Sequence, residues 1–467
     1  MKYISTRGAA PTLAFDDVLV TGLARDGGLY VPDSWPQFSA AELRRFRHLS
    51  YADLAEEVMR PFVAGSIDDA SLRTIIHGAY RDFGHPAVAP LKQLDQRLWL
   101  MELFHGPTLA FKDYAMQVLG RMFDHVLKAR GERVTIVGAT SGDTGSAAIE
   151  ACRDREAIDV FILFPEGRVS PVQRRQMTTV AADNVHAIAL EGHFDDCQDM
   201  VKALFNDLAF RDRLALSAVN SINWARIMPQ IVYYIAAAVA VGAPDRPVAF
   251  SVPSGNFGNV FAAYGAARMG LPVSHLLVGS NRNDILARFF DSGTMAIHGV
   301  EPSLSPSMDI QVSSNFERLL FDLMDRDGAA VAATVSAFRA DGHFAVSQGQ
   351  LAHARAMFQG HAVDDATILA RIAATRAATG EVIDPHTAVG LETSVALGAE
   401  IEAPLIALAC AHPAKFPDAV AQATGVTPVL PPRLADLMER PERVDVLPND
   451  LETMKSFIED RVGGARR

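Results

Sequence analysis

Short runs of almost entirely apolar residues alternate with longer amphipathic stretches along most of the chain after residue 96. Six such runs predict β-strands: residues 134–137, 160–164, 187–190, 248–252, 275–278 and 405–409. Runs that are apolar throughout are typical of strands buried on both faces of a parallel sheet. Strands that alternate with helical segments in this way predict an α/β fold with mostly parallel sheets, plausibly in two lobes.

The first 96 residues show a mixed pattern. A helix is predicted over residues 51–60, and Pro61 is expected to end it. We therefore expect an N-terminal α+β region at 1–96, followed by an α/β catalytic domain at 97–467. Within that domain, residues 329–379 are rich in Ala, Arg and Gln and are predicted to be mostly helical.

Composition and charge narrow the class of protein. The 467 residues are 49% hydrophobic and 21% charged, which is ordinary usage for globular domains. The 43 Lys and Arg residues against 55 Asp and Glu residues give a net charge of −12. A surface that binds nucleic acid is normally basic, so we expect no nucleic-acid partner.

Cysteines and apolar segments indicate the compartment. Cys152, Cys197 and Cys410 lie far apart without a C-x-x-C pair, so we expect free buried thiols, no disulfide and no metal site. Residues 1–8 lead into no apolar signal segment. The longest apolar run, residues 231–243, is shorter than the roughly 20 residues of a membrane span. We expect a cytoplasmic protein without a membrane partner.

Lys112 occupies an unusual position in a predicted helix that ends before Gly131. The apolar stripe of this helix consists of Ala115, Val118, Leu119, Met122, Phe123, Val126 and Leu127. Lys112 lies at the head of that stripe, where burial would favour the neutral amine that Schiff-base chemistry requires. Alternatively, its amine reaches solvent from the helix end, or pairs with Asp113 or Glu102.

Two turns rich in glycine follow predicted strands and precede predicted helices. The first spans residues 138–146 and the second spans 253–259. Unpaired backbone N–H groups at the start of a helix favour an anion such as a phosphate. Taken singly, each turn is more often only a tight connection. Neither is a Walker A sequence, because no Gly-Lys-Ser/Thr follows.

A nicotinamide dehydrogenase is a competing interpretation of the first turn. Gly138, Gly142 and Gly145 are spaced G-x-x-x-G-x-x-G rather than G-x-G-x-x-G. Glu166 nevertheless follows the next predicted strand, where a ribose-binding acid would lie. This alternative leaves Lys112 and the second turn unexplained.

Several longer motifs extend these features over nearly the whole chain. They are residues 5–8, 26–32, 105–113, 139–146, 220–226, 254–259, 384–390 and 411–416. With these motifs the sequence resembles the threonine synthase family, in its longer fungal and bacterial subclass. That family belongs to the pyridoxal-5′-phosphate (PLP) enzymes of fold type II, the tryptophan-synthase-β-like group. The resemblance implies two lobes, the smaller at about 113–240 and the larger at about 97–112 and 241–467.

The resemblance also implies roles for individual residues. Lys112 would form the Schiff base with PLP, and Thr387 would face the pyridine nitrogen, which a hydroxyl cannot hold strongly protonated. Backbone donors would hold the cofactor phosphate at Gly255, Asn256, Phe257, Gly258 and Asn259. The substrate α-carboxylate would bind at Thr140, Ser141, Asp143 and Thr144, with Asp143 in place of the asparagine of short-form enzymes. The substrate phosphate would bind at Asn220, Ser221 and Arg226.

The implied reaction converts O-phospho-L-homoserine and water into L-threonine and phosphate, in a monomer or homodimer. Lys415 is considered as a further anion contact or as a surface lysine. A serine or threonine dehydratase or a cysteine synthase would share the fold and PLP, but their substrates carry no phosphate for Arg226 to bind. A paralogue that binds metabolites without catalysis is a further alternative.

Overall fold

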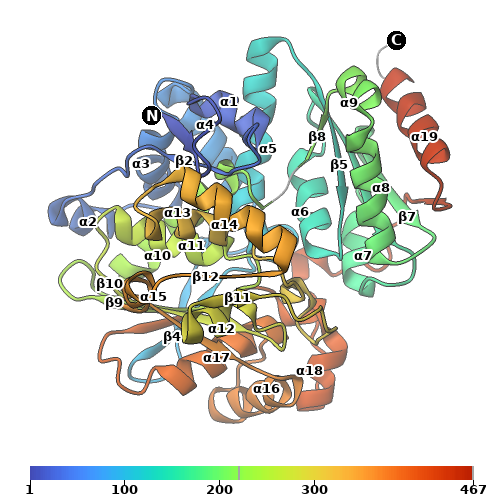
Figure 1. The fold of residues 1–467 in the computed structure, drawn as a ribbon. Helices are drawn as coiled ribbons and strands as arrows, with labels where there is room; N and C mark the ends of the chain where they lie inside the picture. The colour runs from blue at the N-terminus through green and yellow to red at the C-terminus, as the bar shows by residue number, and fades with distance from the viewer. Residues whose placement is uncertain (219–220, 465–467) are drawn as a thin grey trace. The chain divides into compact units, whose positions relative to one another are not determined.

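The computed structural model describes residues 1–218 and 221–464, with side chains up to residue 462. Contacts divide the chain into two compact units, whose elements are labelled in Figure 1. Unit 1 contains Met1–Phe111 and Ser221–Pro428, and unit 2 contains Lys112–Asn220 and Val429–Arg467. The chain therefore enters unit 2 at Lys112, the residue singled out above.

A six-stranded sheet forms the centre of unit 1, in the order β13-β10-β9-β14-β4-β3. Its strands are β3 (Leu91–Gln93), β4 (Leu98–Glu102), β9 (Val248–Pro253), β10 (Val273–Ser280), β13 (Phe358–Ala362) and β14 (Leu405–Ala409). Only β3 runs antiparallel to its neighbour. The carboxyl ends of the other five strands therefore meet at one edge, where loops of a parallel sheet commonly bind ligands.

Helices surround this sheet (Figure 1). The N-terminal part contributes α1 (Phe15–Thr21), α2 (Ala40–Phe46), α3 (Tyr51–Val63) and α4 (Asp69–Tyr80), with the antiparallel pair β1 (Tyr3–Ser5) and β2 (Tyr30–Pro32). The later part contributes α10 (Trp224–Ala240), α11 (Gly258–Arg268), α12 (Ile285–Ser292), α13 (Phe316–Leu323), α14 (Gly328–Asp341), α15 (Gln348–Arg355), α16 (Asp365–Thr379), α17 (Pro385–Leu397) and α18 (Pro417–Thr424). A short antiparallel pair, β11 (Thr294–Ala296) and β12 (His343–Ala345), completes the unit.

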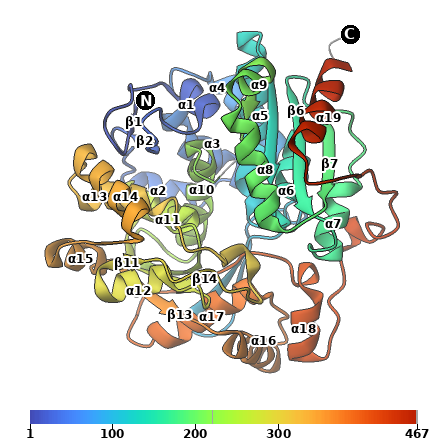
Figure 2. The same cartoon turned by 45° about the vertical axis from the view of Figure 1, so that its right-hand side comes forward.

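Unit 2 is built on a five-stranded parallel sheet in the order β15-β7-β6-β5-β8. The strands are β5 (Val134–Ala139), β6 (Ile158–Pro165), β7 (Val185–Leu190), β8 (Leu216–Ser217) and β15 (Asp445–Leu447). The helices are α5 (Lys112–Arg130), α6 (Asp143–Cys152), α7 (Pro171–Thr178), α8 (Phe194–Asn206), α9 (Leu208–Leu214) and α19 (Leu451–Gly464) (Figure 2). Phe161 and Leu163 of β6 pack under α8, α9 and α19, whereas Ile162 meets α6 on the opposite face.

The sheets confirm the predicted α/β fold, and all six predicted strands are present. One helix boundary was predicted wrongly, because α3 continues past Pro61 to Val63. Phe62 and Val63 are buried in the core, and a proline in the last turn removes only one helical hydrogen bond. Residues 329–379 are mostly helical, but β13 in this range is an edge strand of the sheet that the pattern did not indicate.

The compact units differ from the expected lobes at two places. Helix α10 falls in unit 1, where it packs against α3 and α11, and residues 429–467 fall in unit 2, where β15 pairs with β7. Cys152, Cys197 and Cys410 are buried and form no disulfide bond among the described residues. None of the helices among the described residues combines the length and apolar composition of a membrane span.

Candidate active site

The second glycine-rich turn connects two buried elements of unit 1, β9 and α11. The N–H of Phe257 donates to Ser254 Oγ (3.2 Å), and the N–H of Gly258 donates to Asn256 Oδ1 (3.1 Å). Phe257 adopts a left-handed conformation (φ 64°), which is unfavourable for a residue with a Cβ atom. Its ring is fully buried against Phe316 (centroids 5.2 Å apart), and this packing holds the turn in shape.

The turn is covered by the loop that leads into α13. A Cβ atom on Gly255 would lie 3.0 Å from Met308 Cα, so only glycine allows this approach without displacing the loop. Ser313 Oγ donates to the Gly255 carbonyl (2.8 Å), and the N–H of Asn315 donates to the Asn256 carbonyl (3.0 Å). Because both carbonyls are bonded to the covering loop, the tertiary structure sets the direction in which these two carbonyl groups point.

Asn259, at the start of α11, carries a buried donor without a partner. Its Oδ1 accepts from the hydroxyls of Tyr233 (2.5 Å) and Tyr234 (2.7 Å). Burial raises the pKa of Tyr234, so this hydroxyl remains protonated and donates. Asn259 is 4% exposed, yet its Nδ2 has no hydrogen-bond partner among the described residues. A buried amide donor at a helix N-terminus fits an oxygen of an anionic group.

Arg226 is a second buried donor of unit 1, in the first turn of α10 after the N-cap Asn223. It is 4% exposed, and neither Nε nor Nη1 has a partner among the described residues. Burial lowers the pKa of Arg226 to about 10, so the side chain is still a cation at neutral pH. A buried cation without a counter-charge is costly unless an anion binds it.

The residues around Arg226 connect it to the glycine-rich turn. Its carbonyl accepts from Gln230 Nε2, and Gln230 Oε1 accepts from the Tyr233 hydroxyl (3.1 Å) that also reaches Asn259. The carbonyl of Ser221 accepts from Asn315 Nδ2 (3.3 Å). The structure thus brings Ser221, Arg226 and the turn into one network. The predicted contact Asn220 lies outside the described residues.

Arg318 was not anticipated from the sequence. It is 0% exposed and donates to the carbonyls of Tyr30 (3.0 and 3.1 Å) and Ile222 (2.5 Å) and to Asn315 Oδ1. Burial lowers the pKa of Arg318 to about 9. Its sequence signal is weak, because Arg318 follows another charged residue, Glu317, in the first turn of α13. Through these hydrogen bonds Arg318 connects Tyr30 of the N-terminal region with Ile222, which lies shortly before Arg226.

Thr387 lies in the first turn of α17, whose N-cap is Asp384. Its backbone N–H (3.1 Å) and its hydroxyl both donate to Asp384 Oδ1. The neighbouring ring of His386 accepts at Nε2 from the N–H of Ser307 (3.3 Å), one residue before Met308 at the glycine-rich turn. Thr387 and the 254–259 turn are therefore attached to the same loop of unit 1.

Lys112 opens α5 in unit 2, and its side chain is 12% exposed. Its Nζ lies 3.5 Å from Asp143 Oδ2, so it forms an ion pair with a residue of the first glycine-rich turn. Asp143 Oδ1 in turn accepts from Gln173 Nε2 (2.9 Å), which comes from α7. Three segments of unit 2 thus converge on the amine of Lys112.

The first glycine-rich turn leads from β5 into α6. Thr140 Oγ1 accepts from the N–H groups of Gly142 (3.0 Å) and Gly145 (2.9 Å), so these two amides are already bonded within the turn. The backbone N–H of Thr144 lies at the second position of α6. A donor at this position has no carbonyl one turn earlier in the helix to which it could bond. Ser141 is exposed beside it. The turn can therefore offer only part of its backbone donors to a carboxylate.

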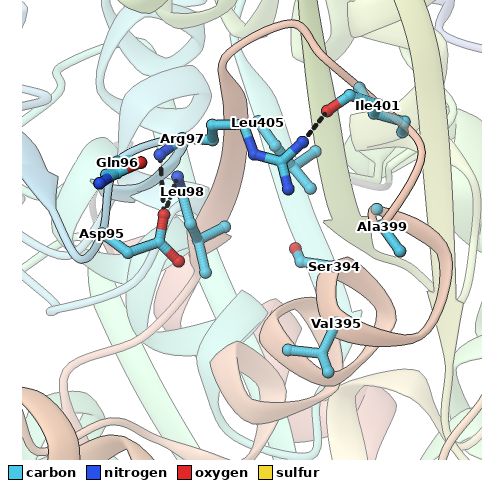
Figure 3. Close-up of a pocket in the computed structure, with 10 residues that line it drawn as sticks. Asp95, Gln96, Arg97, Leu98, Ser394, Val395, Ala399, Ile401 and Leu405 are labelled. Atoms are coloured by element: carbon cyan, nitrogen blue, oxygen red, sulfur yellow. Dashed lines mark hydrogen bonds between the residues drawn. The ribbon is translucent and has the colours of Figure 1, made fainter.

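Two further observations separate the candidate site from other features. Lys415 is fully buried and donates to the Thr108 carbonyl (2.7 Å), so the surface alternative is wrong. A pocket of about 380 Å³ lies beside Arg97, whose Nη1 donates to the Ile401 carbonyl (2.9 Å; Figure 3). This pocket adjoins Leu98 and Leu405, the first residues of β4 and β14. It lies at the sheet edge opposite the glycine-rich turn.

The donor set of unit 1 fits a phosphorylated cofactor and a phosphorylated substrate. Asn259 Nδ2 and two guanidinium nitrogens of Arg226, Nε and Nη1, are buried and lack a partner among the described residues. The cradle at Gly255 has no room for a Cβ atom. These residues offer buried donors, rather than an exposed basic surface, to an anion.

Three family models match the chain. "Threonine synthase N terminus" matches residues 2–80, "Pyridoxal-phosphate dependent enzyme" matches 85–355, and "Threonine synthase, C-terminal" matches 387–458. Among curated proteins, threonine synthase of Pseudomonas aeruginosa is 57% identical over 459 residues, covering 98% of both chains.

Solved structures agree with these matches. The PLP-bound threonine synthase from Brucella melitensis has a TM-score of 0.98 and 53% identity, and the alignment covers 99% of each chain. Threonine synthase from yeast has a TM-score of 0.94 and 38% identity, again over 99% of each chain. The nicotinamide alternative is therefore wrong, and Glu166, on which it relied, is exposed after β6.

Proposed function

The chain belongs to the threonine synthase family and is a PLP-dependent lyase of fold type II, and from this premise we propose which of its residues perform the reaction. The reaction converts O-phospho-L-homoserine and water into L-threonine and phosphate. Both the cofactor and the substrate carry a phosphate, so the site needs two separate anion-binding groups.

One observation carries the assignment of these groups. Arg226 and Asn259 lie on the adjacent helices α10 and α11, and each has a buried donor without a partner among the described residues. We assign the turn of residues 254–259, with Asn259, to the cofactor phosphate. Arg226, with Ser221 and Asn220, is assigned to the substrate phosphate. A dehydratase or cysteine synthase substrate has no phosphate to neutralise Arg226, which favours the threonine synthase reaction.

PLP would be held by Lys112 Nζ, by the 254–259 turn and by Thr387. When bound, it supplies an acceptor for the electron pair released when a Cα–H bond is broken. Lys112 Nζ is assigned to remove the Cα proton and one Cβ proton. After phosphate leaves from Cγ, protons return at Cγ and at Cα, and water supplies the hydroxyl at Cβ. Asp143, held by Gln173, positions this amine through the 3.5 Å contact.

The substrate is anchored at both ends of its carbon chain. The turn with Thr140, Ser141 and Thr144 is assigned to the α-carboxylate, and Arg226 is assigned to the phosphate that leaves from Cγ. Binding of both anionic groups would restrict the rotation of the chain between them, which lowers the entropic part of the barrier. Exclusion of water from the substrate Cα until phosphate has left would prevent side reactions.

Phosphate release from phosphohomoserine tests this assignment. We expect the wild type to be yellow and active, K112A to lose both the visible absorbance and the activity, and K128A to keep both. Lys128 is a suitable control because it lies on the same helix with 47% of its side chain exposed. We expect R226M to keep the absorbance. Its kcat/KM should fall by about 100-fold or more, because a charge-assisted contact to the substrate phosphate is lost. An R226M enzyme with unchanged kcat/KM would contradict the assignment of the substrate phosphate.

We also propose a reducing, cytoplasmic setting, a small-molecule substrate with no nucleic-acid partner, and a monomer or homodimer. The three buried cysteines and the net charge of −12 support the first two points. The division into an N-terminal domain at 1–96 and a two-lobed catalytic domain at 97–467 is likewise a proposal.

A further inference from the structure

Asp384 is a buried carboxylate surrounded by hydrogen-bond donors. It is 0% exposed and caps α17. Its Oδ2 accepts from the backbone N–H (2.9 Å) and from Nδ1 (2.7 Å) of His386. Its Oδ1 accepts from the backbone N–H (3.1 Å) and from the hydroxyl of Thr387. An ionised carboxylate at a helix N-terminus can accept all four of these bonds.

The positions of the protons follow from this network. His386 Nε2 accepts from the N–H of Ser307 (3.3 Å), so the neutral ring carries its proton on Nδ1 and donates it to Asp384. A carboxylate has no proton to give, so the Thr387 hydroxyl must use its only proton as the donor to Asp384. The oxygen of Thr387 then offers lone pairs alone to any other partner.

This arrangement changes what Thr387 can do toward a pyridine nitrogen. A hydroxyl that is free to rotate can donate to an unprotonated ring nitrogen. A hydroxyl committed to Asp384 can only accept, and its bond therefore requires a nitrogen that carries a proton. The family resemblance implied the opposite expectation, namely that a hydroxyl at this position cannot hold the nitrogen strongly protonated.

We propose that Asp384 is a positioning residue that, through the Thr387 hydroxyl, selects the protonated form of the PLP ring nitrogen. This inference rests on the proposed function, in which Thr387 faces that nitrogen. A protonated ring withdraws electrons more strongly, which lowers the barrier to breaking the Cα–H bond. The Asp384 carboxylate acts on the ring nitrogen indirectly, because the uncharged Thr387 hydroxyl lies between them.

The test is the ¹⁵N chemical shift of the ring nitrogen in holoenzyme reconstituted with ring-labelled PLP. We expect a pyridinium shift in the wild type and in T387S, which keeps the hydroxyl. We expect the shift of a neutral pyridine in T387V, which removes the acceptor, and in D384N, whose amide can donate to the hydroxyl and reverse its direction. D364N, a change of the same kind at the exposed N-cap of α16, should leave the shift unchanged.

The variants separate failure of this inference from failure of the proposed function. If T387V leaves the shift of the wild type unchanged, Thr387 does not face the nitrogen, and that assignment fails. If T387V changes the shift and a folded D384N does not, Thr387 keeps its role but the inference about Asp384 is wrong. A neutral nitrogen in the wild type overturns the inference even if D384N does not fold.

Discussion

The candidate site is marked at the scale of single residues by buried donors that lack partners. Arg226 and Asn259 are buried as deeply as core residues, yet their nitrogen atoms remain unsatisfied among the described residues. Such groups destabilise a fold unless a ligand completes them. Arg318 shows the contrasting case, because its guanidinium bonds to two backbone carbonyls and Asn315. Arg318 therefore has a structural role, whereas Arg226 is left available for an anion.

Replacement of Arg226 by methionine should reveal this cost. The lowered pKa reports a penalty for burying the cation, so unliganded R226M should be more stable than the wild type by about 1–3 kcal/mol. Inorganic phosphate should raise the Tm of the wild type more than that of R226M, which keeps only the 254–259 turn as a phosphate site. Urea and thermal unfolding of the apo-proteins measure both effects.

The exposed Arg339 provides the control, because R339M should change the stability by less than about 0.5 kcal/mol and keep the phosphate effect. A less stable R226M with the same phosphate response as the wild type would show that Arg226 is a structural residue.

At the scale of elements, Lys112 is positioned by the close packing of α5 on α6. A Cβ atom on Gly120 of α5 would lie 2.4 Å from the Ala151 carbonyl oxygen of α6. Since backbone cannot yield as a flexible side chain can, a larger residue must push the helices apart. The same two helices begin at Lys112 and Asp143, whose side chains form the ion pair. Helix spacing and site geometry are therefore linked.

The G120A variant should lose about 1–3 kcal/mol of stability, the usual cost of forcing extra volume into a packed interior. Its kcat should also fall, because the Lys112–Asp143 distance depends on the spacing of α5 and α6. Denaturant unfolding and steady-state kinetics measure the two quantities.

Gly349 in α15 is a matched control, since a Cβ atom there meets only Ser347 Oγ at 4.0 Å. G349A should be neutral or more stable by up to about 1 kcal/mol, because alanine favours the helix. Equal effects of G120A and G349A would exclude the packing explanation.

At the scale of the whole molecule, each unit is assembled from two separate stretches of chain. Unit 2 needs Val429–Arg467, which supplies the edge strand β15 and helix α19. Met454, Ile458 and Val462 of α19 are buried against the core formed by β5, β6, β7 and α8. The last segment of the chain is therefore part of the unit that carries Lys112.

Single substitutions on α19 test this dependence. M454A and I458A should each lower the stability by about 2–5 kcal/mol, the cost of removing a large buried apolar side chain. S456A, on the exposed face of the same helix, should stay within about 0.5 kcal/mol of the wild type. Limited proteolysis should cut M454A and I458A first within unit 2, whereas cleavage first in unit 1 would contradict the assignment of α19.

The strands and the glycine-rich turns could be predicted from the sequence because they depend on local properties. A run such as 248–252 is apolar throughout since its strand is buried on both faces, and glycine follows where the backbone must approach other atoms closely. Lys112 stands out because it interrupts a periodic apolar stripe. Thr387 and Arg226 carried no local signal and came from the family resemblance.

The amino-acid order alone determined the α/β class, the six buried strands and the two glycine-rich turns, because periodicity and residue type encode them. It did not determine which side chains meet. The pairing of Lys112 with Asp143, the isolation of the Arg226 guanidinium and the direction of the Thr387 hydroxyl bond were decided by the tertiary structure. The Lys112–Asp143 pair joins separate segments, whereas the Thr387 bond to Asp384 is local. All three depend on burial, which strengthens hydrogen bonds and charge interactions and exists only in the folded chain.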